Sequence, residues 1–381
     1  MGGPLEGIRI LELAGIGPAP YACMLMADLG ANVLRFERGD ANAPLEPTDD
    51  LLNRSKYSVA LDLKSSAGRN LVLDLTERAD ALIEGFRPGV TERLGLGPND
   101  LFARNPSLVY GRMTGFGQQG PLANRAGHDI NYIALSGALW SIGREGERPI
   151  PPLNLVGDFG GGSLFLAFGV VSAILSARRT GEGQIVDAAM VDGSASMLAM
   201  THSLMNAGSW KETRGVNILD TGAHFYEVYE TKDAKYVAVG AIEPKFYADL
   251  LKGLDLDGDS LPAQMNRAEW PEMKDRFERI FAARTRDEWT SIFESTDACV
   301  TPVLSPREAA THPYNTARGV FSTDGGVQPQ PAPRFSKTPG KIVRAPMIAG
   351  SGTHDGLREW GVSEKRIEQL RVDGAFGVAT K

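Results

Sequence analysis

The chain has few of the residues that build metal sites and disulfide frameworks. Its 381 residues include only two cysteines, Cys23 and Cys299, and only five histidines. The cysteines stand far apart and neither belongs to a CxxC pair, so the sequence predicts no disulfide framework and no metal site. We interpret both cysteines as small apolar residues in a reducing compartment, an interpretation favoured over a nucleophilic role.

An excess of positive charge and a membrane-spanning run are also absent. The net charge of −7 disfavours a nucleic-acid partner, although it leaves room for a local basic patch. The longest apolar run, Leu164 to Ala177, is too short to cross a bilayer, so we expect a buried helix and no membrane partner. Met1 to Ile10 lacks the features of a signal peptide, and Val378 to Lys381 is not the Ser-Lys-Leu peroxisomal address. A cytoplasmic protein is expected.

The first 115 residues alternate between strand-like and helix-like segments. This succession predicts right-handed crossovers and an α/β fold with a mostly parallel, Rossmann-like sheet. Ligands of such folds bind at the carboxyl ends of the strands. Strands are expected at residues 8–13, 31–36, 58–63, 81–84 and 108–113, and helices at 21–29, 67–78 and 101–105.

The rest of the chain predicts a second, smaller domain. Residues 163–207 are largely helical in pattern, and a hairpin is expected from residues 225–230 and 236–240. Helices are expected near residues 244–251 and 270–284, and a last helix begins near residue 356. We therefore predict a large α/β domain from residues 1–190 and 330–381, a small α+β domain from residues 225–315, and linkers at 191–224 and 316–329.

A glycine-containing turn after the first strand looks like a dinucleotide-binding fingerprint. It reads Gly15-Ile16-Gly17-Pro18-Ala19-Pro20, and Glu37 stands roughly where the ribose carboxylate would fall. However, Pro20 replaces the third glycine, which allows close helix–strand packing, and Pro18 lacks an amide for pyrophosphate. The sequence therefore disfavours a dinucleotide site.

A histidine and an aspartate stand in glycine-rich surroundings. His128 lies in Ala126-Gly127-His128-Asp129-Ile130-Asn131-Tyr132, and Asp158 opens the run Asp158-Phe159-Gly160-Gly161-Gly162-Ser163. Such residues suit an acid/base pair beside a backbone that can approach a ligand closely. A structural role in a turn for His128, and a helix N-cap role for Asp158, stay open as alternatives.

Several short motifs over some 190 residues occur in a recognisable order. They are residues 7–13 (GIRILEL), 27–33 (ADLGANV), 53–56 (NRSK), 60–64 (ALDLK), 86–90 (FRPGV), 115–121 (GFGQQGP) and 183–187 (GQIVD). In this order they resemble the class III CoA-transferase superfamily. Ser55 departs from the family, which has glycine at this position of Asn-Arg-Gly-Lys, and residues 297–303 follow a small-domain motif only loosely.

Three further segments narrow the resemblance. Residues 127–132, 154–158 and 240–244 are similar to the branch that racemises 2-methyl-branched acyl-CoA thioesters. The resemblance implies an isomerase of fatty acid and lipid metabolism that acts by 1,1-proton transfer through an enolate, without a cofactor. It implies catalytic roles for His128, Asp158 and Glu243, with Glu243 near His128. It also implies two domains joined by long linkers and an interlocked homodimer.

The chemistry of that reaction suits these residue types. A proton on carbon 2 of a thioester is only weakly acidic, so its transfer needs positioned groups that titrate near neutral pH. An unperturbed imidazole has a pKa near 6.5, so a histidine at position 128 suits this task. Partial desolvation would raise the pKa of Asp158 toward the same range. Glu243 before Pro244 could instead be a plain surface residue at a helix start.

The resemblance also implies a binding site for the acyl-CoA substrate. Arg38, Lys64 and Arg93 would bind the CoA nucleotide, although they could equally be solvated surface charges. Ala60 and Leu61 would flank the adenine, and Met113 and Gly115 would lie along the pantetheine. The remaining substrate-binding candidates are Asp129, Tyr132 and Asn154.

Two other functions are compatible with the same motifs. In a class III CoA transferase, Asp158 would be the nucleophile that forms a mixed anhydride and an aspartyl thioester. That mechanism has no need of His128 or Glu243, so these residues discriminate between the two reactions. A catalytically silent CoA-binding protein is disfavoured because all the acid/base candidates are present.

Overall fold

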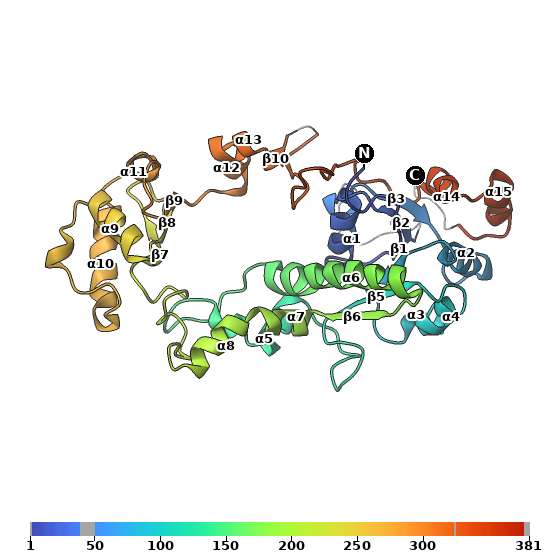
Figure 1. The fold of residues 1–381 in the computed structure, drawn as a ribbon, viewed down its shortest axis with the longest axis horizontal. Coiled ribbons are helices and arrows are strands. Elements are labelled where there is room, and N and C mark those ends of the chain that lie inside the picture. Colours follow the sequence, from blue (N-terminus) through green and yellow to red (C-terminus); the bar gives the residue numbers. More distant parts are fainter. Residues whose placement is uncertain (1, 39–49, 324, 377–381) are drawn as a thin grey trace. The chain divides into compact units, whose positions relative to one another are not determined.

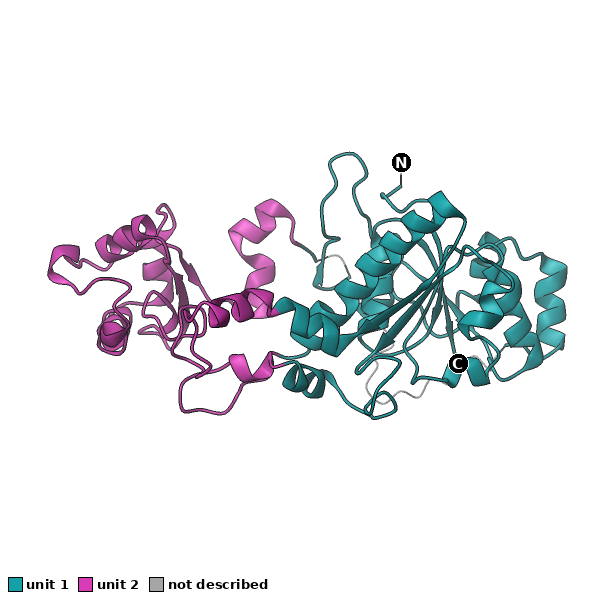
Figure 2. Cartoon of the chain, turned by 60° about the horizontal axis from the view of Figure 1, so that its bottom comes forward, with its two compact units in different colours: residues 1–136, 153–197, 321–381 teal, residues 137–152, 198–320 magenta. Residues whose placement is uncertain are grey.

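A computed structural model describes residues 2–38, 50–323 and 325–376, so Val378–Lys381 lie outside the described residues. The chain forms two compact units, coloured separately in Figure 2. Unit 1 comprises Met1–Ser136, Leu153–Met197 and Phe321–Lys381, and unit 2 comprises Gly137–Pro152 and Leu198–Val320. Unit 2 thus takes a segment from inside the predicted large domain, and the predicted linkers stay a prediction.

Unit 1 is built on a six-stranded sheet in which every neighbouring pair is parallel. The strand order β3-β2-β1-β4-β5-β6 is that of a doubly wound fold, so the prediction of a mostly parallel Rossmann-like sheet is confirmed. The edge strand β6 lies within the region for which only helices were predicted. The strands are β1 (Arg9–Leu13), β2 (Asn32–Glu37), β3 (Tyr57–Ala60), β4 (Ala81–Glu84), β5 (Val109–Thr114) and β6 (Ile185–Ala189).

Helices cover both faces of this sheet (Figure 1). One face packs against α1 (Pro18–Asp28) and α6 (Phe165–Thr180). The other packs against α2 (Ser66–Thr76), α4 (Pro98–Phe102), α14 (Thr353–Glu359) and α15 (Glu364–Val372). The remaining elements of unit 1 are η1 (Leu51–Asn53), α3 (Val90–Arg93), α5 (Asp129–Leu135), the π-helix η3 (Leu155–Leu164), α7 (Met190–Met197), β10 (Phe321–Ser322) and β11 (Gln328–Pro329).

Buried ion pairs hold the first turns of this unit in place. The Lys56 Nζ atom donates to Glu12 Oε2 at 2.7 Å and to the carbonyl oxygen of Pro20 at 2.9 Å. The Arg54 guanidinium donates to the carboxylate of Asp28 at 2.6 Å. Burying such charges is tolerated because each is paired and hydrogen-bonded. The motif Asn53–Lys56 therefore anchors α1 to the sheet.

Ser55 shows why glycine suits its position in that motif. Its φ of 63° lies in the left-handed region, which side chains other than glycine seldom adopt. The Ser55 hydroxyl offsets part of this strain, because it donates to Asp28 Oδ1 at 3.1 Å and accepts from the Val343 amide at 3.2 Å.

The helix α6 differs from the buried helix that was predicted. Only one of its faces packs on the sheet, through residues such as Leu166 and Val170. The opposite face exposes an apolar stripe at i, i+4, i+7 and i+11, formed by Leu164, the last residue of η3, and by Phe168, Val171 and Leu175 of α6. The continuous helical run Leu155–Thr180 is also long and apolar enough to cross a membrane, by length and composition alone.

Unit 2 is an α+β unit around an antiparallel sheet. The predicted hairpin is present as β7 (Tyr226–Glu230) and β8 (Tyr236–Gly240), and β9 (Val300–Pro302) pairs with β8. Its core is rich in aromatic side chains, including Phe225, Phe277 and Trp289. The other elements are η2 (Leu139–Ser141), α8 (Ala199–Asn206), α9 (Pro244–Gly253), η4 (Gly258–Ser260), η5 (Arg267–Glu269), α10 (Trp270–Phe281), α11 (Arg286–Phe293), α12 (Pro306–Thr311) and α13 (Pro313–Arg318).

Candidate active site

Most of the predicted site residues follow the carboxyl ends of the parallel strands. Arg38 comes directly after β2, Ala60 ends β3, Met113 lies in β5 and Gly115 follows β5. In a parallel sheet these ends share one edge. The strand order reverses between β1 and β4, which is where ligands of doubly wound folds bind.

The glycine-containing turn after β1 faces Asp158. Gly17 has a φ of 70°, and a Cβ atom at this position would lie 3.4 Å from Asp158 Oδ2. Pro18 then begins α1, where its missing amide costs no hydrogen bond. This turn, which the sequence showed only as an imperfect dinucleotide fingerprint, thus borders the Asp158 carboxylate.

Asp158 lies inside the π-helix η3, so it is not the N-cap; that position belongs to Asn154. The Asp158 amide donates to Asp129 Oδ2 at 2.7 Å, and Asn154 Nδ2 donates to Asp158 Oδ2 at 3.2 Å. Both the backbone and the carboxylate are therefore held. π-helical turns are rare and frequently lie at functional sites.

The surroundings of Asp158 favour its protonated form. Burial raises the pKa of the Asp158 carboxyl above its usual range, and the nearby charge of Asp129 adds to the rise. The hydrogen bond from Asn154 and the charge of His128 act in the opposite direction. A carboxyl of raised pKa is suited to both accepting and returning a proton.

His128 stands at the N-cap position of α5, next to this carboxyl group. Its amide donates to Asn131 Oδ1 at 3.0 Å, and its carbonyl accepts from the Asn131 amide at 2.8 Å. The His128 side chain is exposed, and its charge acts on the pKa of Asp158. The structure therefore brings the two predicted acid/base residues into one site.

A buried tyrosine packs against the end of β5. A Cβ atom at Gly115 would lie 2.1 Å from the Tyr132 ring, which also meets Phe116 edge-on at a centroid distance of 4.9 Å. Burial raises the pKa of Tyr132 to about 12, and its hydroxyl donates to the carbonyl oxygen of Gly127. Tyr132 thereby ties the segment before His128 to α5.

The glycine run after Asp158 has a packing role that the sequence did not predict. A Cβ atom at Gly161 would lie 2.6 Å from the amide nitrogen of Ser194, and one at Gly162 would lie 2.8 Å from Met190. These two glycines therefore let η3 pack closely against α7, rather than opening the backbone to a ligand.

The predicted nucleotide-binding cations all present exposed side chains. Arg38, Lys64 and Arg93 are exposed on unit 1, and a Cβ atom at Gly89 would lie 3.1 Å from Arg93 Nη1. Ala60 and Leu61 are buried. Their contacts with a nucleotide stay a prediction.

The sequence did not reveal a buried cation, Arg112, that contacts the segment carrying Arg93. Arg112 donates to Glu84 Oε1 at 3.0 Å and to Glu92 Oε1 at 2.9 Å, which braces the segment after β4 that carries Arg93. Burial raises the pKa of Glu84 to about 7 despite this pairing. Only the parallel register of β4 with β5, which sets Glu84 opposite Arg112, reveals the pair.

Glu243 lies in unit 2, at the N-cap position of α9, and its side chain is exposed. Its expected proximity to His128 stays a prediction. Unit 2 also contains the buried His224, whose Nε2 atom lies 2.8 Å from the Tyr247 hydroxyl and whose pKa burial lowers to about 4. His224 has the surroundings of a structural histidine.

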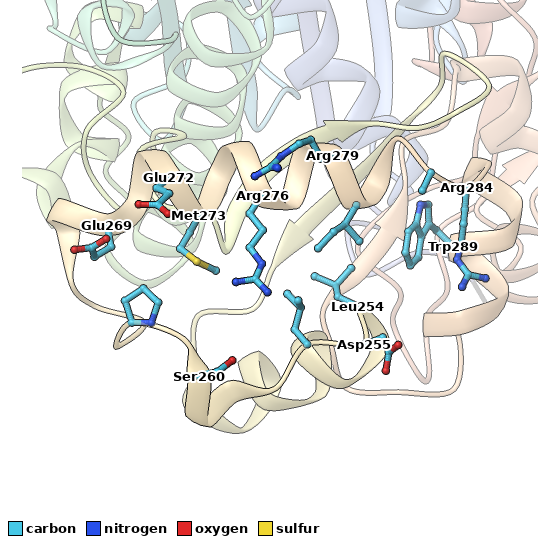
Figure 3. A pocket seen from close by; sticks show the side chains of 15 residues that line it. Leu254, Asp255, Ser260, Glu269, Glu272, Met273, Arg276, Arg279, Arg284 and Trp289 are labelled. Carbon is cyan, nitrogen blue, oxygen red and sulfur yellow. The ribbon is translucent and has the colours of Figure 1, made fainter.

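A separate cavity of about 850 Å³ opens in unit 2 (Figure 3). Its lining comes from residues 253–289, and Arg276 points into it from α10. The guanidinium groups of Arg276, Arg279 and Arg284 are balanced by the carboxylates of Asp255, Glu269 and Glu272. The cavity therefore offers no excess of charge to an ionic ligand.

Comparisons with known proteins agree on one family. A family model described as CoA-transferase family III matches residues 5–353. Alpha-methylacyl-CoA racemase of Mus musculus is 49% identical over 373 residues, which cover 97% of this chain and 96% of the relative. The Homo sapiens protein of the same name is 46% identical with the same coverage. A CAIB/BAIF family protein from Brucella suis shares the fold, with a TM-score of 0.81 and 24% identity, over 94% of this chain and 100% of that structure.

Proposed function

Since this chain belongs to CoA-transferase family III, we propose that it is an isomerase that racemises 2-methyl-branched acyl-CoA thioesters. Two relatives that are 49% and 46% identical to this chain are named alpha-methylacyl-CoA racemase, which supports this activity. The observation that carries the proposal is the hydrogen bond of 2.7 Å from the Asp158 amide to Asp129, the residue directly after His128, which holds the two acid/base candidates in one site.

The proposed mechanism uses two bases on the two faces of carbon 2. In one direction the neutral imidazole of His128 takes the proton, the electron pair moves to the thioester oxygen as an enolate, and the Asp158 carboxylic acid returns a proton to the opposite face. In the reverse direction the Asp158 carboxylate takes the proton and the imidazolium of His128 returns one. Each direction therefore needs one proton on the pair.

The enolate also needs hydrogen-bond donors that stabilise the negative charge of the thioester oxygen. The proposed reaction uses no cofactor, because the two side chains supply both proton transfers.

Exposed apolar residues support the proposal of a homodimer. The stripe on α6, formed by Leu164 at the end of η3 with Phe168, Val171 and Leu175, leaves Phe168 77% and Leu175 62% accessible to solvent. Monomeric proteins seldom leave large contiguous apolar patches uncovered. A second copy would cover the stripe, in keeping with the interlocked homodimer that the sequence resemblance implies. The cytoplasmic location stays a prediction.

The function is tested with one pure epimer of a 2-methylacyl-CoA in D₂O. We expect deuterium at carbon 2 and approach to an even mixture of epimers, and we expect His128→Ala to lose inversion by about a hundredfold or more. Full inversion by His128→Ala would refute the two-base assignment. Absence of exchange and inversion in the wild type, with a hydroxylamine-sensitive adduct at Asp158, would favour CoA transfer instead.

A further inference from the structure

A fully buried hydroxyl joins the two backbone segments that border the Asp158 carboxylate. Ser163 Oγ lies 2.7 Å from the carbonyl oxygen of Pro18 and 2.9 Å from the carbonyl oxygen of Asp158. The Ser163 side chain has no exposed surface. A serine hydroxyl has a single hydrogen, so both carbonyls accept from it in a shared, three-centre bond.

The positions of the two joined segments determine how much space a substrate has beside the Asp158 carboxylate. Pro18 directly follows Gly17, where an added Cβ atom would lie 3.4 Å from Asp158 Oδ2. Asp158 itself is the other partner of the hydroxyl. A shift of the Pro18 turn relative to Asp158 would therefore narrow or widen the approach to the carboxylate.

The other polar contacts of Asp158 hold it from a different side. Asp129 accepts from the Asp158 amide and Asn154 donates to the carboxylate, which fixes Asp158 relative to α5 and within η3. Neither bond reaches the turn after β1. On the far side of that turn, Lys56 holds the carbonyl oxygen of Pro20 at 2.9 Å. Ser163 completes the connection between the anchored turn and the anchored carboxylate.

We infer that Ser163 is a positioning residue for the Asp158 face of the racemase reaction. Ser163 acts through Asp158, because its hydroxyl is already hydrogen-bonded to two carbonyl oxygens and has no hydrogen left for the substrate. It sets the gap between the turn Gly15–Pro18 and the carboxylate, and hence the path along which carbon 2 approaches Asp158. This inference rests on the proposed racemase function.

A positioning role predicts a kinetic result that general damage to the active site does not. If the Asp158 face is misaligned, His128 still removes a proton from the epimer whose hydrogen faces it. The exposed imidazole then exchanges that proton with D₂O and returns deuterium to the same face. Exchange with retention would survive while inversion falls, whereas general damage would lower both together.

The experiment compares wild type, Ser163→Ala and Ser194→Ala with each pure epimer of a 2-methylacyl-CoA in D₂O. Ser194 is a matched control, because it is also fully buried and its hydroxyl donates to the Met190 carbonyl, within its own helix, at 2.7 Å. Deuterium in the recovered epimer and the rate of inversion are measured in the same samples, and circular dichroism establishes that each variant is folded.

We expect Ser163→Ala to lose inversion about tenfold to a hundredfold, the effect of a misplacement of about 1 Å. The ratio of exchange with retention to inversion should rise for one epimer only, and it should stay at the wild-type value in Ser194→Ala. Ser163→Cys, which keeps a weak donor, should give an intermediate ratio and provides the reading if Ser163→Ala does not fold. Equal loss of exchange and inversion, or an unchanged ratio in the folded variants, would overturn the inference alone. A wild type that inverts neither epimer would overturn the proposed function and the inference with it.

Discussion

At the scale of single residues, the proposed mechanism depends on how the surroundings of Asp158 balance its protonated and ionised forms. Asp158 is half-buried and receives a hydrogen bond from Asn154, while Asp129 adds negative charge nearby. Burial and Asp129 favour the acid, whereas Asn154 favours the carboxylate. The balance suits a group that must act as an acid in one direction and as a base in the other.

Removing the Asn154 amide should move the pH dependence of the reaction. In Asn154→Leu the ionised form of Asp158 loses a donor, so the pKa of Asp158 rises further. The form with both His128 and Asp158 protonated has no base, so the acid limb of the kcat/KM profile should move to higher pH. Racemisation rates from pH 4 to 9 check this expectation.

The exposed Asn206, in unit 2, gives a control for that experiment. Asn206→Leu should leave the acid limb where it is in the wild type. An acid limb that stays fixed, or moves to lower pH, in Asn154→Leu would show that this hydrogen bond does not tune the carboxyl group.

At the scale of elements, the end of β5 and the helix α5 are fitted to each other. Gly115 follows β5 and leaves room for the ring of Tyr132, whose hydroxyl in turn holds the carbonyl of Gly127. His128 comes directly after Gly127. The packing of one strand end therefore fixes the entry into α5, the helix that follows the proposed catalytic residue His128.

Gly115→Ala should disturb this fit. Its Cβ atom would overlap the buried Tyr132 ring at 2.1 Å, so α5 or the ring must move. Overpacking of this kind costs about 1–3 kcal/mol of unfolding free energy. We expect that loss in urea denaturation, together with slower racemisation because His128 is displaced.

Gly85→Ala, after the neighbouring strand β4, is a suitable comparison. Its Cβ atom would meet Ala19 at an ordinary 3.6 Å, so a change of less than about 1 kcal/mol is expected. If the two variants prove equally stable, the fit between Gly115 and Tyr132 contributes nothing to the fold.

At the scale of the whole molecule, the described part of the single chain leaves an apolar surface exposed. The stripe on α6 lies opposite the face that packs on the sheet, so the sheet cannot cover it. The racemase candidates are also divided, since His128 and Asp158 belong to unit 1 and Glu243 to unit 2. A dimer would account for the stripe.

Placing a charge in the stripe should therefore separate the copies. In Phe168→Asp a carboxylate would have to be buried without a partner, so we expect a monomer in sedimentation experiments and loss of racemisation. Val372→Asp, an exposed apolar residue of α15 at 73% accessibility, should stay a dimer. A monomeric wild type that binds lipid vesicles would contradict the proposal and favour a membrane as the covering surface.

The sequence by itself determined the pattern of the parallel sheet, and it predicted the acid/base pair. Strands such as β1 and β4 are short apolar runs that are buried on both faces, so their pattern is visible without a structure. The edge strand β6 was missed because its first residues are exposed and it pairs only with β5. The motifs around His128 and Asp158 narrowed the family resemblance to one branch without help from the fold.

Only the tertiary structure decided how those residues are held. Whether Asp158 caps a helix or lies within one depends on the π-helical turn, which a run of glycines does not specify. The bond from Ser163 to Pro18 joins residues 145 positions apart, and the ion pair of Arg112 with Glu84 depends on strand register. A sequence pattern reports which local structures are favourable, whereas these contacts arise when distant segments pack together. That packing sets the geometry of the proposed catalytic groups and the pKa of Asp158.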